Sequence, residues 1–211
     1  MKKLLCLCSS LVLIFSTLLG TPTIIQASTY ESNTQDENLA QIVEYMNTHA
    51  NQLEFPEAGG ITSQTYEIPL KDGSMVSSTV SIENVTPMLR STTSYPVKLG
   101  GSYIFTWTVP LDAILGGQTT IKLYYSVSSN SYSSLTGSTA FINSTPPQFY
   151  SIIDQSMYYI NSSGSTLTAT GYTSFKPSLA DVTYNRYYDV EIYGTSGYAN
   201  ITYNAYWKEI V

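Results

Sequence analysis

Apolar and polar residues alternate along most of the second half of this 211-residue sequence. Successive side chains of a strand point to opposite faces of a sheet, so this period of two predicts strands with one buried and one wet face. The pattern is clearest in two runs, whose apolar sides hold Tyr103, Phe105, Trp107 and Val109, and then Ile121, Leu123, Tyr125 and Val127. We therefore predict a mainly β chain with an antiparallel β-sandwich at residues 97–211, an immunoglobulin-like arrangement or a partly closed barrel being the variants.

Turn residues separate these runs and support antiparallel pairing. The strongest hairpin pattern places Gly194-Thr195-Ser196-Gly197 between two alternating runs near the C-terminus. Earlier in the chain, Asp72-Gly73 joins two shorter runs, and Pro69 marks the first of these as an edge strand because proline has no amide hydrogen to donate. We expect residues 61–96 to form a β-hairpin and a linker ahead of the sandwich.

A different period, of three to four residues, occurs between Thr34 and Phe55. The apolar positions with this spacing are Leu39, Ile42, Val43, Met46, Ala50 and Leu53. The pattern predicts one amphipathic helix within an N-terminal region at residues 28–60, and Pro56 would end it.

The first 27 residues have the three parts of a secretory signal peptide. Lys2 and Lys3 form a positive start, an apolar run follows at residues 4–19, and Ala27 supplies the small residue at the expected cleavage point. The apolar run is shorter than the roughly 20 residues of a membrane-spanning helix. In form, the segment resembles the export signals of Gram-positive bacteria. We therefore expect a secreted, extracellular protein with no stable membrane anchor after signal removal.

Removal of this segment would change the chemistry available to the chain. Both cysteines, Cys6 and Cys8, lie within it, so the remaining 211 − 27 = 184 residues would hold no disulfide, Cys-ligated zinc or thiol nucleophile. The net charge would change from −6 to −8 because Lys2 and Lys3 are lost. A chain this acidic offers no basic patch to neutralise phosphates, which excludes a nucleic-acid partner.

Few residues could support catalysis. His49 is the only histidine and falls in the predicted helix, away from the serine-rich loops, so a Ser-His-Asp triad is not expected. Asp189 and Glu191 share one side of a predicted strand, about 7 Å apart at the strand rise, and form the carboxylate pair of an alternative hypothesis, a secreted hydrolase. Asp181 could add a third oxygen ligand for calcium, but the spaced pattern of a calcium loop is missing. Neither a metal nor a cofactor is predicted.

Tyrosine is the most informative residue type, because 15 of the 19 tyrosines lie at or after residue 103. Its apolar ring and polar hydroxyl suit a half-wet position, and an adjacent pair in a strand directs one ring inward and one outward. Cross-strand aromatic pairs stabilise sheets, which is the simplest explanation. The alternative is a recognition surface for a cell-wall glycan or a protein ligand, for which the candidate residues are Tyr124, Tyr187, Asp189, Glu191 and Tyr193.

A membrane-active β-hairpin is a further functional hypothesis. Residues 124–143 are low in charge and rich in serine and threonine. Ser128, Ser129, Asn130 and Gly137 interrupt the continuous apolar face of about 9 to 11 residues that a spanning strand needs. The sequence therefore favours a non-catalytic exported binding protein over a hydrolase or a membrane-active protein.

Overall fold

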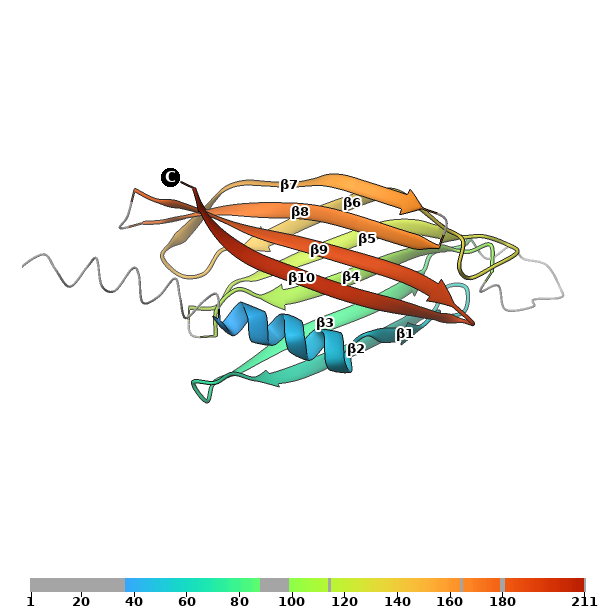
Figure 1. Ribbon diagram of the computed structural model, residues 1–211, viewed down its shortest axis with the longest axis horizontal. Coiled ribbons are helices and arrows are strands. Elements are labelled where there is room, and N and C mark those ends of the chain that lie inside the picture. The colour runs from blue at the N-terminus through green and yellow to red at the C-terminus, as the bar shows by residue number, and fades with distance from the viewer. Residues whose placement is uncertain (1–36, 88–98, 114, 164, 179–180, 211) are drawn as a thin grey trace, which may run out of the picture. The chain divides into compact units, whose positions relative to one another are not determined.

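The computed structural model of the chain describes residues 37–87, 99–113, 115–163, 165–178 and 181–210 (Figure 1). The predicted signal peptide at residues 1–27 and most of the predicted linker before residue 97 lie outside these ranges. The arrangement described below is that of Asn38–Val211, which form one structural unit.

Within these described ranges, ten strands form two five-stranded antiparallel sheets, which face each other as a sandwich (Figure 1). The strands are β1 (Gln52–Glu54), β2 (Ile61–Pro69), β3 (Met75–Asn84), β4 (Ser102–Pro110), β5 (Gln118–Val127), β6 (Leu135–Thr145), β7 (Tyr150–Ser163), β8 (Thr166–Pro177), β9 (Thr183–Thr195) and β10 (Tyr198–Ile210). We call β2-β3-β4-β5-β6 the N-terminal sheet and β1-β10-β9-β8-β7 the C-terminal sheet. The predicted antiparallel β-sandwich is confirmed.

Each sheet is a meander in which strands adjacent in sequence pair with each other, apart from β1. This order differs from the Greek-key connections of an immunoglobulin-like sandwich, and the two sheets stay separate instead of closing as in the barrel variant. β3 pairs with β4, from Thr79 opposite Thr108 to Asn84 opposite Tyr103. The expected hairpin is present as β2 and β3, which pair from Ile61 opposite Glu83 to Pro69 opposite Met75, and its second strand is joined to the following sandwich strands through β4.

Alternation sorts the side chains of the strands as predicted. All eight residues of the two expected apolar sides, in β4 and β5, are buried between the sheets. The ring centroid of Trp107 lies 4.9 Å from that of Tyr203 and 6.3 Å from that of Tyr188, both on the other sheet. Its indole N–H donates a hydrogen bond to Ser78 Oγ at 3.2 Å. Trp107 thus joins the two sheets through its ring contacts, while its indole N–H is bonded to a neighbouring strand, β3, of its own sheet.

A chain of hydroxyl groups crosses the core between the sheets. Thr119 Oγ1 lies 2.6 Å from the Tyr188 hydroxyl and 2.9 Å from Ser144 Oγ, which in turn lies 2.9 Å from Thr173 Oγ1. All four side chains are buried, and both sheets contribute two of them. Because a buried hydroxyl group without a partner costs about 1–3 kcal/mol, this network favours one packing of the sheets over others.

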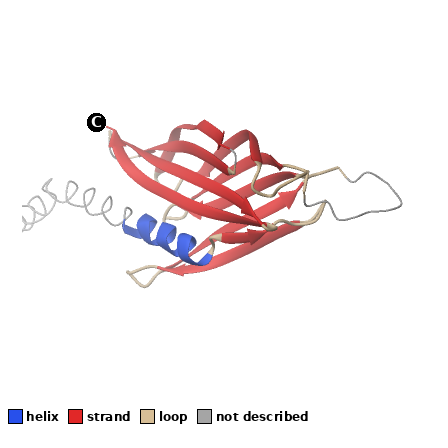
Figure 2. Cartoon of the chain, turned by 45° about the vertical axis from the view of Figure 1, so that its right-hand side comes forward, coloured by secondary structure: helices blue, strands red, loops and turns tan. Residues whose placement is uncertain are grey.

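A helix over residues 37–49 covers the side of the sandwich between β10 and β2 (Figure 2). Its apolar residues Leu39, Ile42 and Met46 are buried in the core shared by both sheets. The Asn47 side chain pairs with the backbone of β10, donating to the Tyr203 carbonyl and accepting from the Tyr203 N–H, both at 2.8 Å. These two hydrogen bonds continue the ladder beyond β1 and protect the edge of β10 from other strands.

The helix is shorter than the apolar spacing predicts. The periodic pattern continued to Phe55, but the helix ends at residue 49 and the chain enters β1, where Leu53 is paired with Ala199 of β10. Leu53 is buried at the core in this strand, as it would be in a longer helix. The apolar pattern therefore does not show where the helix ends and β1 begins.

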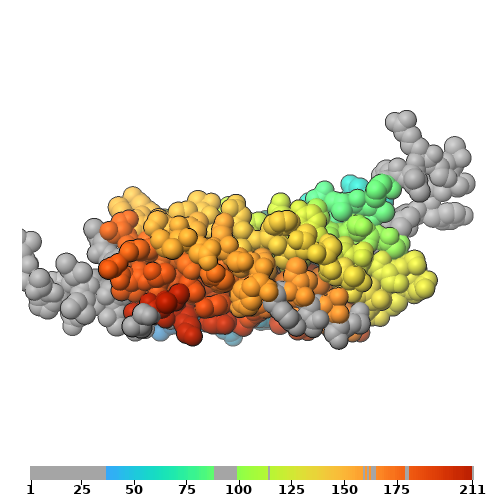
Figure 3. All heavy atoms as spheres, turned by 90° about the horizontal axis from the view of Figure 1, so that it is seen from above, coloured from blue at the N-terminus to red at the C-terminus, as the bar shows by residue number. Residues whose placement is uncertain are grey.

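The other side of the sandwich is closed by β6 and β7, which contact each other across the two sheets (Figure 3). Gly137 of β6 marks the close approach, because a Cβ atom there would lie 2.5 Å from Leu167 Cδ1 and 2.9 Å from Ile160 Cγ2. Glycine is required at this position by packing between the sheets.

The predicted hairpin near the C-terminus is confirmed as a two-residue turn between β9 and β10. Ser196 and Gly197 have positive φ angles of 43° and 90°, as in the turns that match the twist of antiparallel strands. The tight turn fixes the register of the two strands, in which Tyr187 lies opposite Tyr206. This register positions the surface described next.

Candidate functional site

Four tyrosines form a continuous row across the outer face of the C-terminal sheet. They are Tyr158 on β7, Tyr172 on β8, Tyr187 on β9 and Tyr206 on β10, and are called the tyrosine row below. Neighbouring ring centroids are separated by 5.9 Å, 6.1 Å and 5.1 Å, in that order along the row. The rings thus extend across four adjacent strands.

Strand register brings the rings together. Tyr187 is the register partner of both Tyr172 and Tyr206. Alternation directs Tyr187 outward and its neighbour Tyr188 into the core, as the sequence predicted for adjacent tyrosines. A register shift in β7 adds one residue there, and the ring of Tyr158 lies against that of Tyr172.

The row presents aromatic surface to solvent. The two end rings are the most exposed, at 56% for Tyr158 and 46% for Tyr206. Tyr172 and Tyr187 are half-buried, because each has a ring on both sides. Rings in this position remain accessible to a ligand while their neighbours hold them in place.

Polar groups border the tyrosine row on both sides. The Tyr172 hydroxyl donates to Asp154 Oδ2 at 2.5 Å, and the Asn204 side-chain amide donates to Asp189 Oδ2 at 3.0 Å. Asp189 follows Tyr187 by two residues and occupies the next outward position on β9, whereas Asp154 lies on β7 opposite Ser174 of β8, on the other side of the row. The row therefore runs between two carboxylates.

These carboxylates influence the tyrosine hydroxyls. The pKa of Tyr172 is raised, chiefly by its hydrogen bond to the Asp154 carboxylate. Partial burial is the main cause of the raised pKa of Tyr158 and of Tyr206, and the negative charge of Asp189 raises both further. Asp189 therefore acts on rings at both ends of the row.

The structure places four of the five predicted binding residues on this face. Tyr187, Asp189, Glu191 and Tyr193 lie at alternate outward positions along β9. Tyr124 lies on β5, on the outer face of the N-terminal sheet, and so belongs to a separate surface. Tyr193 lies three outward positions further along β9 than Tyr187, opposite Asn200 of β10.

The other three members of the tyrosine row were not among the predicted binding residues. Tyr172 continues the outward side of β8 that begins with Thr166, so its orientation could be inferred from alternation. Its position between Tyr158 and Tyr187 depends on strand order, which alternation does not determine.

The predicted carboxylate pair lies on an open sheet face. Asp189 is half-buried beside Asn204, and Glu191 is exposed opposite Thr202. A hydrolase of this type needs one carboxyl group shielded enough to stay protonated at neutral pH. The geometry of this pair favours ligand binding over acid–base catalysis.

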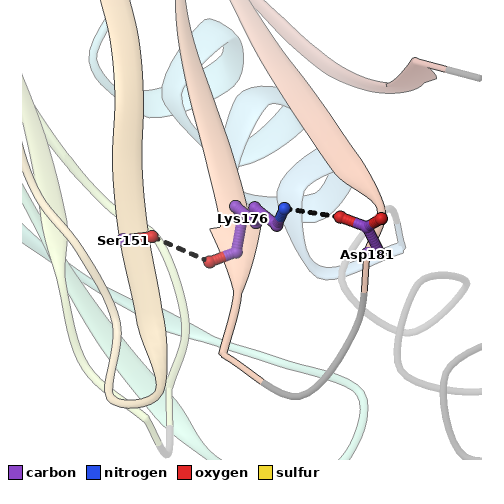
Figure 4. A network of polar contacts seen from close by, with 3 residues as sticks. All are labelled: Ser151, Lys176 and Asp181. Carbon is purple, nitrogen blue, oxygen red and sulfur yellow. Dashed lines mark hydrogen bonds and ion pairs between the residues drawn. The ribbon is translucent and has the colours of Figure 1, made fainter.

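Asp181, considered above as a third oxygen ligand for calcium, is paired with a lysine side chain. Asp181 lies in the connection between β8 and β9 and forms an ion pair with Lys176, whose Nζ is 2.5 Å from Oδ1 (Figure 4). The hydrogen bond from Lys176 and its positive charge lower the pKa of Asp181. Within the ranges that the structure describes, no three histidine, cysteine or acidic side chains gather as metal ligands would.

The stretch considered for membrane activity is part of the sandwich. Residues 124–143 cover the end of β5 and most of β6, and Tyr125, Val127 and Leu135 from this stretch are buried in the core. In the described part of the chain, no helix has the length and apolar character needed to cross a membrane.

Comparisons of the chain with protein-family models, with curated proteins and with solved structures found no match.

Proposed function

We propose that this protein is exported and binds a cell-wall glycan through the tyrosine row, without catalysing a reaction. The observation that carries the proposal is the contact of four outward-facing rings across four adjacent strands. Such a row is an elongated platform, which suits a ligand made of successive similar units.

The chemistry of the row and its borders matches a glycan. The C–H groups on the face of a sugar ring carry partial positive charge and pack against the negative face of an aromatic ring. Sugar hydroxyl groups donate and accept hydrogen bonds, for which the Asp189 carboxylate and the Asn204 amide are suitable partners. A protein ligand would instead favour a patch with a desolvated centre, whereas this row is narrow and has polar groups on both sides.

Export is supported by the three-part signal pattern in residues 1–27. We expect a Gram-positive expression host to release the protein into the medium with Ser28 as its new N-terminus. Mass spectrometry of the released protein measures this directly. Recovery of the chain only from the cell interior, with residues 1–27 intact, would contradict export.

The binding proposal is tested by affinity electrophoresis in gels that contain soluble cell-wall glycan fragments, neutral or charged. Tyr187→Ala removes the ring that contacts both Tyr172 and Tyr206, so we expect affinity to fall about tenfold or more. Tyr124→Ala is the matched control, because it removes a half-buried outward tyrosine of the N-terminal sheet, where its ring contacts that of Phe141. Circular dichroism checks that both variants fold.

The control variant is expected to migrate as the wild-type protein does. Equal retardation of both variants and the wild type would reject the tyrosine row as the binding surface. An absence of retardation of the wild type by every glycan of the panel would reject the proposed function.

A further inference from the structure

We infer that the tyrosine row and Asp189 together select glycans that carry free amino groups, that is, amino sugars in their ammonium form. This inference rests on the binding function proposed above and names the ligand class for the same site. One carboxylate lies beside the most closely stacked rings of the tyrosine row.

Asp189 lies next to the Tyr187–Tyr206 pair. The centroids of these two rings are 5.1 Å apart and their planes differ by 16°. Asp189 and its register partner Asn204 occupy the next outward positions on the same two strands, and the Asn204 amide donates to Asp189 Oδ2 at 3.0 Å. A carboxylate has about four acceptor sites, so one amide donor leaves capacity for a ligand.

An ammonium group gains from both parts of this arrangement. It is attracted to the negative face of a tyrosine ring, here the face of the 46% exposed Tyr206 ring that is turned away from Tyr187, and, through charge and hydrogen bonds, to a carboxylate. A hydroxyl or acetamido group can form hydrogen bonds to Asp189 but gains neither charge interaction. At an exposed site, the two interactions together correspond to about a threefold to tenfold gain in affinity.

The charges on this face of the sheet also favour a cation. The acidic side chains at outward positions are Glu54, Asp154, Asp189 and Glu191, and the basic ones are Lys176 and Lys208. Lys176 is paired with Asp181. Lys208 follows Asn204 by four residues on β10, which places it about 13 Å along the strand. Among these charged side chains, Glu191 occupies the next outward position to Asp189 on β9, so the immediate surroundings of Asp189 are negative and an anionic glycan would be repelled.

Two matched oligosaccharides test this inference. The probes are a glucosamine oligomer and its N-acetylated counterpart of the same length, titrated by calorimetry into the purified protein at a pH that keeps the amine protonated. We expect the wild type to bind the glucosamine oligomer about three to ten times more tightly.

Two variants assign this preference to one carboxylate. Asp189→Asn keeps the shape of the side chain and removes its charge, so we expect it to lose the part of the preference that comes from the carboxylate and to bind the glucosamine oligomer less tightly than the wild type does. Glu191→Gln removes a charge two residues away on the same face of β9, and we expect it to keep most of the preference. An equal loss in both variants would overturn the role of Asp189.

The outcomes separate the inference from the function on which it rests. Equal or tighter binding of the N-acetylated oligomer by the wild type would overturn the inference and support the glycan-binding function. Failure of both oligomers and of the wider glycan panel would overturn the function as well. Equal affinity for a lysine-containing peptide of the same charge would overturn the assignment to amino sugars.

Discussion

The outer faces of the two sheets use similar residue types in different arrangements. On the N-terminal sheet, threonine side chains meet across strands, with 2.9 Å between the hydroxyl oxygens of Thr65 and Thr79, and a ring contact joins Tyr124 to Phe141. On the C-terminal sheet, the tyrosine row extends across four strands. Both sheets have five strands and share one core.

This difference shows that a sheet of this protein can form without a long aromatic row on its outer face. Threonine pairs are sufficient over much of the N-terminal sheet, and an aromatic pair contributes only about 0.2–1 kcal/mol. The tyrosine row therefore offers more aromatic surface than sheet formation requires. We attribute the excess to ligand binding.

The largest effect on stability is expected in the core, on which both outer faces depend. Trp107→Ala would remove a fully buried ring that contacts Tyr188 and Tyr203 of the opposite sheet, so we expect a loss of about 3–5 kcal/mol in the free energy of unfolding. Urea denaturation measures this loss. A decrease below about 1 kcal/mol would show that the two sheets do not share one cooperative core.

The inner tyrosines of the two sheets should respond to pH in the same way. Burial raises the pKa of Tyr125 on one sheet and of Tyr203 on the other above the ordinary value of 10.0. Their contribution to stability is therefore complete below that pH and decreases as the pH rises, because the unfolded tyrosines ionise first. The slope is about 1.4 kcal/mol per pH unit for each group.

Urea denaturation at a series of alkaline pH values measures this slope. Tyr125→Phe and Tyr203→Phe should each reduce this slope by the contribution of one tyrosine, about 1.4 kcal/mol per pH unit. An unchanged slope in both variants would contradict the account of their burial.

An inner and an outer tyrosine hydroxyl should differ by a smaller amount. Tyr188→Phe removes a buried hydroxyl 2.6 Å from Thr119 Oγ1, so we expect a loss of about 1 kcal/mol. Tyr206→Phe removes the hydroxyl of a ring that is 46% exposed, and we expect a change below about 0.5 kcal/mol. Thermal unfolding of the two variants measures this difference in stability. A larger loss for Tyr206→Phe than for Tyr188→Phe would contradict the stabilising role of the buried hydroxyl chain.

The smallest effect is expected when the C-terminal sheet is made to resemble the N-terminal one. Tyr206→Thr removes one ring contact, with Tyr187, so the loss of stability should be below about 1 kcal/mol. Thr65→Ala on the opposite outer face is the matched control and should have a similarly small effect. Thermal unfolding that shows a loss above about 2 kcal/mol for Tyr206→Thr alone would mean that the row stabilises the sheet, against its attribution to binding.

Local patterns predicted which way side chains point, but not which residues become neighbours. Alternation placed Trp107 in the core and Tyr187 outward because orientation repeats every two residues. The place of Tyr172 between Tyr158 and Tyr187 depends on the register in which β7, β8 and β9 pair, including the extra residue in β7, and alternation does not determine this register. The pairing of β3 with β4 likewise joins residues 61–84 to the sandwich, which no turn or apolar pattern in that segment indicates.

Direct contact between a glycan and the tyrosine row can be observed by nuclear magnetic resonance of isotope-labelled tyrosine rings during titration with a glucosamine oligomer. We expect the ring signals of Tyr158, Tyr172, Tyr187 and Tyr206 to shift together, while the signal of Tyr124 on the opposite outer face does not. Shifts at Tyr124 with an unchanged tyrosine row would contradict this contact.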